Sequence, residues 1–283
     1  MDIILLSELF TIPTDAENQD WNAIITNQHC TFLNRKCLKV RKSEPEISIG
    51  SCSVKYGKGL SDVIICPYRL IEKRKIFLDC IHLLSLHEPG NDLHVVPELA
   101  IPGGTIDYFL ASVKNGKVID FVGIELQTLD TTGTVWPVRQ RFLQSKGIAV
   151  NEKDTASRKT FGMNWKMTAK TILVQLHHKI QTFEHLNKRL VLVTQNHLLN
   201  YMQSQFSFDH ISKTVRIGDS MHFHSYSLDK NNGRYNLKLE NRLSTDSDGI
   251  AKCIGLQAEA KVELEIIFEV IQAKLSERTL FII

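Results

Sequence analysis

The sequence predicts an α/β fold in which a mixed β-sheet is flanked by helices. Residues 105–113 and 117–128 have the apolar character of strands, and the Asn-Gly pair between them is a strong β-hairpin signal. Residues 165–186 then carry apolar side chains at helical spacing, and residues 189–195 form a short apolar run typical of a buried strand. The order strand, strand, helix, strand indicates an α/β core.

Further segments are predicted on either side of this core. The apolar start of the chain, within residues 1–29, predicts a packed N-terminal helix, because it is too short and too acidic for a signal peptide. Residues 69–87 predict a helix that ends before Pro89-Gly90. Residues 222–240 predict a hairpin, and residues 256–276 predict a closing helix.

We therefore expect three regions along the chain. These are an N-terminal helix and cysteine module (1–90), a catalytic core (91–215), and a C-terminal hairpin and helix that pack on the core (216–283). A hydrophobic fraction of 43% and a charged fraction of 23% are typical of a soluble globular protein. No apolar run approaches the roughly 20 residues of a membrane helix. We expect a cytoplasmic protein without disulfides and without a membrane partner.

Positive charge is concentrated in two places, although the net charge of +3 identifies no partner by itself. Residues 35–42 carry five positive charges and no acid, and residues 139–170 carry eight positive charges against two negative ones. Such clusters predict contact with a phosphate backbone, and a solvated surface is the alternative. The candidate DNA-binding residues are Arg35, Lys36, Lys39, Arg41, Lys42, Arg139, Arg141 and Lys159.

The predicted hairpin carries two acids. Asp107 lies in its first strand, while Glu125 and Gln127 share one face of its second strand. Metal-dependent nucleases use such an acid, followed by acid-x-Lys on a second strand, to hold a cation and a water, and here Gln127 stands in place of the lysine. Because Mg²⁺ itself lowers the pKa of bound water, a glutamine that only orients the water is compatible with hydrolysis. Glu98 is a further candidate acid, and surface strand charges are the alternative interpretation.

Four of the six cysteines lie in one stretch with little periodic structure. Cys30, Cys37, Cys52 and Cys66 are separated by six, fourteen and thirteen residues. Four thiolates in one loop-rich segment are typical of a tetrahedral Cys₄ site that holds zinc or a single iron, and ordinary core packing is the alternative. The predicted role is structural, and it would also fix the cations of residues 35–42 for DNA.

Taken together, these blocks resemble the NotI-type restriction endonucleases, a branch of the PD-(D/E)xK nuclease superfamily. The resemblance rests on "CTFLNRKCLKVRKSEPEISIGSCSVKYG", "IICPYRL", "PGGTIDYFLASV" and "VGIELQTLDTTG", which follow one another within roughly residues 28–145. It implies a PD-(D/E)xK nuclease core with Asp107 and Glu125 as catalytic, Mg²⁺-binding acids, and Gln127 at the third position as in this branch. Glu98 matches as an assisting acid. The resemblance also implies iron on the four cysteines, with zinc as the alternative.

The resemblance further implies a homodimeric Type II restriction endonuclease of a bacterial or archaeal cytoplasm. Such an enzyme cuts double-stranded DNA at a short palindrome with Mg²⁺, leaves 5′-phosphates, and pairs with a DNA methyltransferase in a restriction-modification system. Two other functions stay open at this point. One is a repair or mobile-element nuclease on the same core, and the other is a metal-stapled DNA-binding protein without cleavage.

Overall fold

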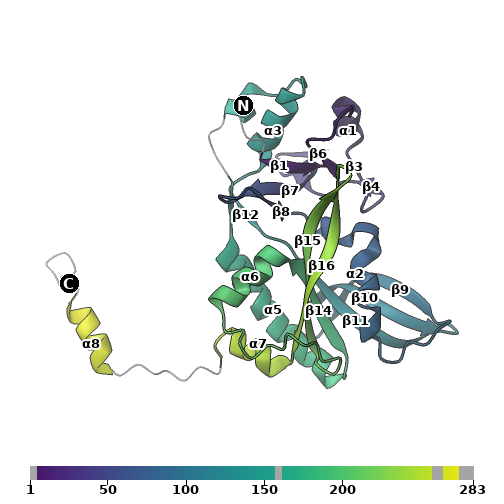
Figure 1. Cartoon of the computed structure of the whole chain (residues 1–283), viewed down its shortest axis with the longest axis vertical. Helices are drawn as coiled ribbons and strands as arrows, with labels where there is room; N and C mark the ends of the chain where they lie inside the picture. The colour runs from purple at the N-terminus through teal and green to yellow at the C-terminus, as the bar shows by residue number, and fades with distance from the viewer. Residues whose placement is uncertain (1–4, 157–160, 257–263, 274–283) are drawn as a thin grey trace.

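A six-stranded mixed sheet forms the centre of the computed structural model, which describes residues 5–156, 161–256 and 264–273 (Figure 1). The strand order is β16-β15-β14-β11-β10-β9. The strands are β9 (Asp92–Ile101), β10 (Gly104–Lys114), β11 (Lys117–Gln127), β14 (Arg189–Gln195), β15 (Met221–Asn231) and β16 (Arg234–Thr245). Strand β14 pairs in parallel with β11 and β15, and the other pairs are antiparallel.

The predicted hairpin over residues 105–128 is confirmed as β10 and β11. Asn115 and Gly116 both have positive φ, 52° and 74°, which is the geometry of the two-residue turns that suit a twisted antiparallel pair. The hairpin over residues 222–240 is also confirmed as β15 and β16. It completes the central sheet, because β15 pairs directly with β14. Strand β9 was not predicted.

Helices cover one face of the sheet (Figure 1). Helix α5 (Trp165–His185) and strand β14 confirm the predictions for residues 165–186 and 189–195. The buried side of α5 includes Ile172, Leu176 and Ile180, which recur at the spacing of one helix face. Helices α6 (Asn196–Gln205) and α7 (Ser247–Cys253) pack against α5.

The opposite face is covered by a broken helical segment. It consists of the 3₁₀-helix η1 (Pro67–Arg74), helix α2 (Lys75–Leu78) and the 3₁₀-helix η2 (Ile81–Leu83). The prediction of one continuous helix over residues 69–87 is therefore wrong. Lys73 and Arg74 adopt left-handed φ values of 49° and 57°, which interrupt the helical path.

The predicted N-terminal helix is also wrong. Residues Leu6–Leu9 form strand β1, which is buried along its whole length and joins a second, four-stranded sheet. That sheet has the order β2-β1-β7-β8, with β2 (Ile12–Pro13), β7 (Ser51–Tyr56) and β8 (Ser61–Ile64). Helix α1 (Trp21–Asn27) begins only after Asp20, whose carboxylate accepts a hydrogen bond from the Ala23 amide and caps the helix.

The remaining elements are short. They are β3 (His29–Cys30), β4 (Arg35–Lys36), β5 (Val40–Arg41), β6 (Glu44–Ser48), β12 (Thr131–Thr132), β13 (Gly162–Met163), α3 (Trp136–Ser145), α4 (Glu152–Ala156) and α8 (Leu264–Gln272). Helix α8 lies within the predicted closing helix, whose residues 257–263 and 274–276 are outside the described residues. Among the helices of the described ranges, none has the length and apolar character required to span a bilayer.

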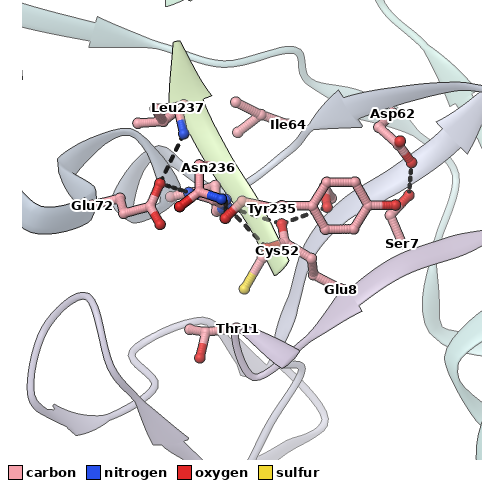
Figure 2. A network of polar contacts seen from close by, with 12 residues as sticks. Ser7, Glu8, Thr11, Cys52, Asp62, Ile64, Glu72, Tyr235, Asn236 and Leu237 are labelled. Atoms are coloured by element: carbon pink, nitrogen blue, oxygen red, sulfur yellow. Dashed lines mark hydrogen bonds and ion pairs between the residues drawn. The ribbon is translucent and has the colours of Figure 1, made fainter. Parts of the chain in front are cut away.

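One buried ion pair connects the two sheets. Arg69 of η1 is fully buried, and its Nε lies 2.9 Å from the carboxylate of Glu8 on β1. Its other nitrogens bind the carboxylate of Glu72 and the main-chain oxygen of Tyr235 on β16, each at 2.9 Å. Figure 2 shows these surroundings, in which Glu72 also accepts a hydrogen bond from the Leu237 amide. Burial raises the pKa of Glu8, so its charge depends on Arg69.

A cluster of histidines lies under the helical segment. His222 and His224 of β15 are fully buried, and His224 stacks on His82 of η2 while its Nδ1 lies 3.6 Å from Sγ of Cys80. Burial lowers the pKa of His222 to about 4 and that of His224 to about 3, and Arg242 lowers the latter further. The cluster is therefore neutral in the folded protein at neutral pH.

Replacing Arg69 with methionine should destabilise the fold strongly. The change leaves Glu8 buried without its cation, which typically costs about 3–5 kcal/mol of unfolding free energy. Lys114→Met is the matched control, because Lys114 and Glu88 form an ion pair at the surface, with side chains 53% and 65% exposed. Denaturant titration of both variants measures the difference, and equal stabilities would contradict the importance of the buried pair.

Stability should also fall on acidification because of the buried histidines. Their pKa values are lowered in the folded state, so the unfolded chain binds more protons below about pH 6.5. Each contributes up to about 2 kcal/mol of lost stability at pH 5, and the loss continues towards the folded pKa values. Unfolding free energies measured between pH 8 and pH 5 for the wild type and His224→Asn test this. Parallel pH profiles would contradict the prediction.

Candidate active site

The strands β9, β10 and β11 bring the predicted acids together. Tyr108 pairs with Ile124, so the next positions along the ladder place Asp107 of β10 across from Glu125 of β11. The Oδ2 of Asp107 accepts a hydrogen bond from the Leu126 amide at 2.8 Å, which fixes its side chain against β11. The hairpin therefore holds the two carboxylates at one point of the sheet.

Glu98 lies beside this pair on the neighbouring strand. In the β9–β10 register Pro97 pairs with Tyr108 and Leu99 with Ile106, so Glu98 is across from Asp107. Its backbone is left-handed, with φ of 47°, which interrupts the ladder there. Its charge raises the pKa of Asp107. The structure thus brings the three acids that were predicted from the sequence into one neighbourhood.

Burial perturbs both members of the pair. It raises the pKa of Glu125 to about 7, opposed by the hydrogen bond from Lys179 and supported by the charge of Asp107. Burial also raises the pKa of Asp107, opposed by the Leu126 amide and by Lys179. Two carboxylates that are partly desolvated and close to each other favour a cation between them. Because Mg²⁺ commonly takes one or two carboxylates and completes its shell with water, this donor set fits that ion.

Lys179 is a site residue that sequence reasoning missed. It extends from α5, is 7% exposed, and its Nζ lies 2.8 Å from Oε1 of Glu125. Within the predicted helix of residues 165–186, Lys179 belongs to no sequence motif. Its partner Glu125 lies 54 residues earlier in the chain. Gln127 was a signal that the strand supplies no cation to the acids, but nothing in the sequence indicated which residue does.

Gln127 is half-buried at the end of β11. Its Nε2 donates a hydrogen bond to the main-chain oxygen of Thr128 at 2.6 Å, while its own main-chain oxygen accepts one from the Thr194 hydroxyl at 2.8 Å. The side-chain amide is therefore held by the main chain just after β11, and the main chain of Gln127 is tied to β14. An amide in this place supplies hydrogen bonds without charge.

The four predicted metal-binding cysteines are all buried. Their charges act on one another, because Cys37 raises the pKa of Cys30, and Cys30 raises those of Cys52 and Cys66. Burial is the main cause that raises the pKa of Cys66 to about 11, and Lys39 opposes it. Four thiols are chemically suitable ligands for a soft cation. Within the described part of the chain, however, no three His, Cys, Asp or Glu side chains have the spacing of a metal site.

Arg35, which lies between Cys30 and Cys37, acts electrostatically on residues near the acids. Burial raises the pKa values of Tyr68 and Tyr108, the charge of Glu98 adds to this increase, and the charge of the exposed Arg35 on β4 opposes it. Tyr68 follows Cys66 in the chain, and Tyr108 follows Asp107. Arg35 and Glu98 therefore act electrostatically on the same two half-buried tyrosines.

The other predicted DNA-binding residues differ in their surroundings. Lys36 and Lys42 are exposed, while Lys39 donates a hydrogen bond to the main-chain oxygen of Ile65. Arg41 forms ion pairs with Glu44 and Asp154.

The two predicted arginines of the second cationic cluster are less open to solvent. Arg139 is only 4% exposed, stacks on Trp136 and donates to the main-chain oxygen of Ile49, so its guanidinium is committed within the protein. Arg141 donates to the main-chain oxygen of Thr155. Lys159 lies outside the described residues.

Comparison with known proteins gives one family. The family model described as "Restriction endonuclease NotI" matches residues 25–237, which include all three acids, Gln127, Lys179 and the four cysteines. No curated protein matches the chain.

Proposed function

The chain belongs to the NotI restriction endonuclease family, and we propose that it cuts double-stranded DNA at a short palindromic site by Mg²⁺-dependent hydrolysis, leaving 5′-phosphates. Site-specific DNA cleavage is the activity of this family. The observation that carries the finer proposal is the pairing of Asp107 with Glu125 across the β10–β11 hairpin. The family match favours restriction over a repair or mobile-element nuclease and over a binding module without cleavage.

The residues of the site have separate tasks in this proposal. Asp107 and Glu125 hold Mg²⁺, and Glu98 assists from β9. When bound, the ion supplies an activated water and neutralises charge that develops on the phosphate. Gln127 orients the attacking water by hydrogen bonding, and the half-buried setting of the pair limits competing solvent. The surrounding sheet is a PD-(D/E)xK core in this assignment.

We propose that the cationic segment of residues 35–42 contacts DNA. Arg35 and Lys42 are exposed and lie in the same segment as the cysteines, so they are available for phosphates. Lys36 is also exposed, and its Nζ donates a hydrogen bond to the main-chain oxygen of Glu46, which a phosphate would have to replace. Arg139 has a structural role instead, since its guanidinium is buried. A duplex with a palindromic site presents two equivalent phosphodiesters, which suits a homodimer with one acid pair per chain. A partner methyltransferase would protect the host site.

A structural metal is proposed for the cysteine quartet, iron by family resemblance and zinc as the alternative. The four buried thiols and their mutual influence support it. A cation would lower the free energy of the thiolates, which burial otherwise disfavours. Closing the tetrahedron requires the thiols to move into ligand distance, and metal binding supplies the free energy for that change.

Removing either acid should abolish cleavage. Asp107→Ala or Glu125→Ala removes a metal ligand, so cleavage of DNA that the wild type cuts should fall by about a thousandfold or more. DNA binding should persist or tighten, since a negative charge near the phosphates is lost. The control is Glu88→Gln, which removes a surface acid on the loop before β9. Gel assays of cleavage and binding on sequenced plasmid DNA measure both, and undiminished cutting by either alanine variant would remove the proposed metal site.

The cysteine quartet should carry one tightly held metal per chain. Elemental analysis of the purified protein should find iron, or zinc in its place. Cys52→Ser should lose the metal and lower thermal stability, because the binding free energy folds this segment. Cys253→Ser is the matched control, since Cys253 is equally buried but lies on α7 outside the quartet. A folded, active sample with neither metal would show that these cysteines only pack the core.

A further inference from the structure

We propose that Lys179 is the positioning cation of the active site. It supplies from helix α5 the positive charge that the acid-x-Lys pattern places on the strand, where this chain has Gln127. This inference rests on the proposed Mg²⁺-dependent hydrolysis. The contact that carries it is direct, since Nζ of Lys179 lies 2.8 Å from Oε1 of Glu125. Both side chains are nearly inaccessible, with 9% and 6% of their surfaces exposed.

The local structure is built to bring Lys179 to this place. The turn between β9 and β10 packs on α5, where the Thr182 hydroxyl donates a hydrogen bond to the main-chain oxygen of Pro102 at 2.9 Å. A Cβ added at Gly104 would lie 3.1 Å from Cε of Lys179, and one at Gly103 would lie 2.5 Å from the main-chain oxygen of His178. Only residues without a side chain permit this approach of the turn to the helix. The turn leads directly into the strand that carries Asp107.

The charge balance of the site calls for a cation. Glu98, Asp107 and Glu125 lie together where a polyanionic substrate must approach, and Gln127 adds no charge. Among the described residues, Lys179 is the one lysine in ion-pair contact with any of the three acids. It holds the carboxylate of Glu125 in place for the metal, and its charge offsets the repulsion between the acids and the phosphate. In acid-x-Lys nucleases the cation is on the strand, whereas here it comes from the helix.

A second ion pair on the same strand separates a role in the site from a role in folding. Lys188 lies 2.6 Å from Asp120, whose side chain is 2% exposed, and Asp120 is on β11 five residues before Glu125. Five strand residues span about 16 Å, so this pair is remote from the acids. A variant of Lys188 therefore measures the effect of breaking a half-buried lysine–carboxylate pair on β11 without changing the site.

The test relocates the charge. Lys179→Met, Lys188→Met and the double variant Gln127→Lys/Lys179→Met are compared with the wild type in single-turnover cleavage at saturating Mg²⁺, with thermal unfolding as the check of folding. Gln127 and Glu125 project from the same face of β11, so a lysine at position 127 places its ammonium beside the acids. DNA affinity is measured in Ca²⁺, so that a loss of rate is not confused with a loss of binding.

We expect Lys179→Met to cut about a hundredfold more slowly with DNA affinity nearly unchanged, and Lys188→Met to cut within about threefold of the wild type. The double variant should recover at least about tenfold of the lost rate, because the strand then carries the charge. If Lys179→Met does not fold, a double variant that folds and cuts within about tenfold of the wild type supports the proposal on its own. Cleavage by Lys179→Met at the wild-type rate overturns the proposal. A folded double variant also overturns it if it cuts no faster than Lys179→Met, or less than a hundredth as fast as the wild type. A wild type that cuts no DNA with Mg²⁺ would instead contradict the proposed function.

Discussion

The guanidinium of Arg69 holds together three segments that are distant in sequence. It is fully buried, so it depends on partners that satisfy both its charge and its N–H groups, and it finds them on β1, within η1 and on β16. This contact fixes the helical segment of residues 67–84 against the central sheet. Leu70 and Ile76 of that segment then pack in one cluster with Ile124, the neighbour of Glu125. The position of the strand that carries Glu125 is thus supported from the other side by a buried ion pair outside the candidate site.

The candidate active site also contains a buried carboxylate paired with a buried cation. Glu125 and Lys179 are buried like Glu8 and Arg69, but Lys179 acts on two carboxylates, since its charge also opposes the burial that raises the pKa of Asp107. Burial raises the pKa of Glu125 to about 7, which means that its surroundings disfavour the carboxylate relative to water despite the contact with Lys179. At Glu8 both carboxylate oxygens accept from the Nε–H of Arg69, and one of them also accepts a hydrogen bond from the Ser53 hydroxyl. A fully satisfied pair suits a framework, whereas a pair with remaining demand for positive charge suits a metal site.

Local patterns predicted those elements whose geometry is set by neighbouring residues. Asn115-Gly116 specified a hairpin turn, and the apolar spacing of residues 165–185 specified a helix. The N-terminal strand was mistaken for a helix because its burial depends on β7, some 45 residues away, as in the contact of Glu8 with Ser53.

The candidate site was predictable to a similar extent. The acids could be recognised, since they lie on one hairpin and in a family pattern. Lys179 could not, because a lysine on an amphipathic helix looks like any solvated residue until the fold places Glu125 beside it. Arg139 shows the converse, since a cation expected at the surface is buried between Trp136 and Phe10.

The interruption of β9 at Pro97 and Glu98 has a consequence for association between molecules. In the described structure β9 is the last strand of the central sheet, it pairs only with β10, and it is exposed along most of its length. An open strand of this length is a template for the addition of foreign strands and for aggregation. Pro97 has no N–H to offer an incoming strand, and the left-handed backbone of Glu98 breaks the row of donors and acceptors. The same two residues that place an acid beside Asp107 thus make the exposed edge of the sheet a less regular template for an added strand.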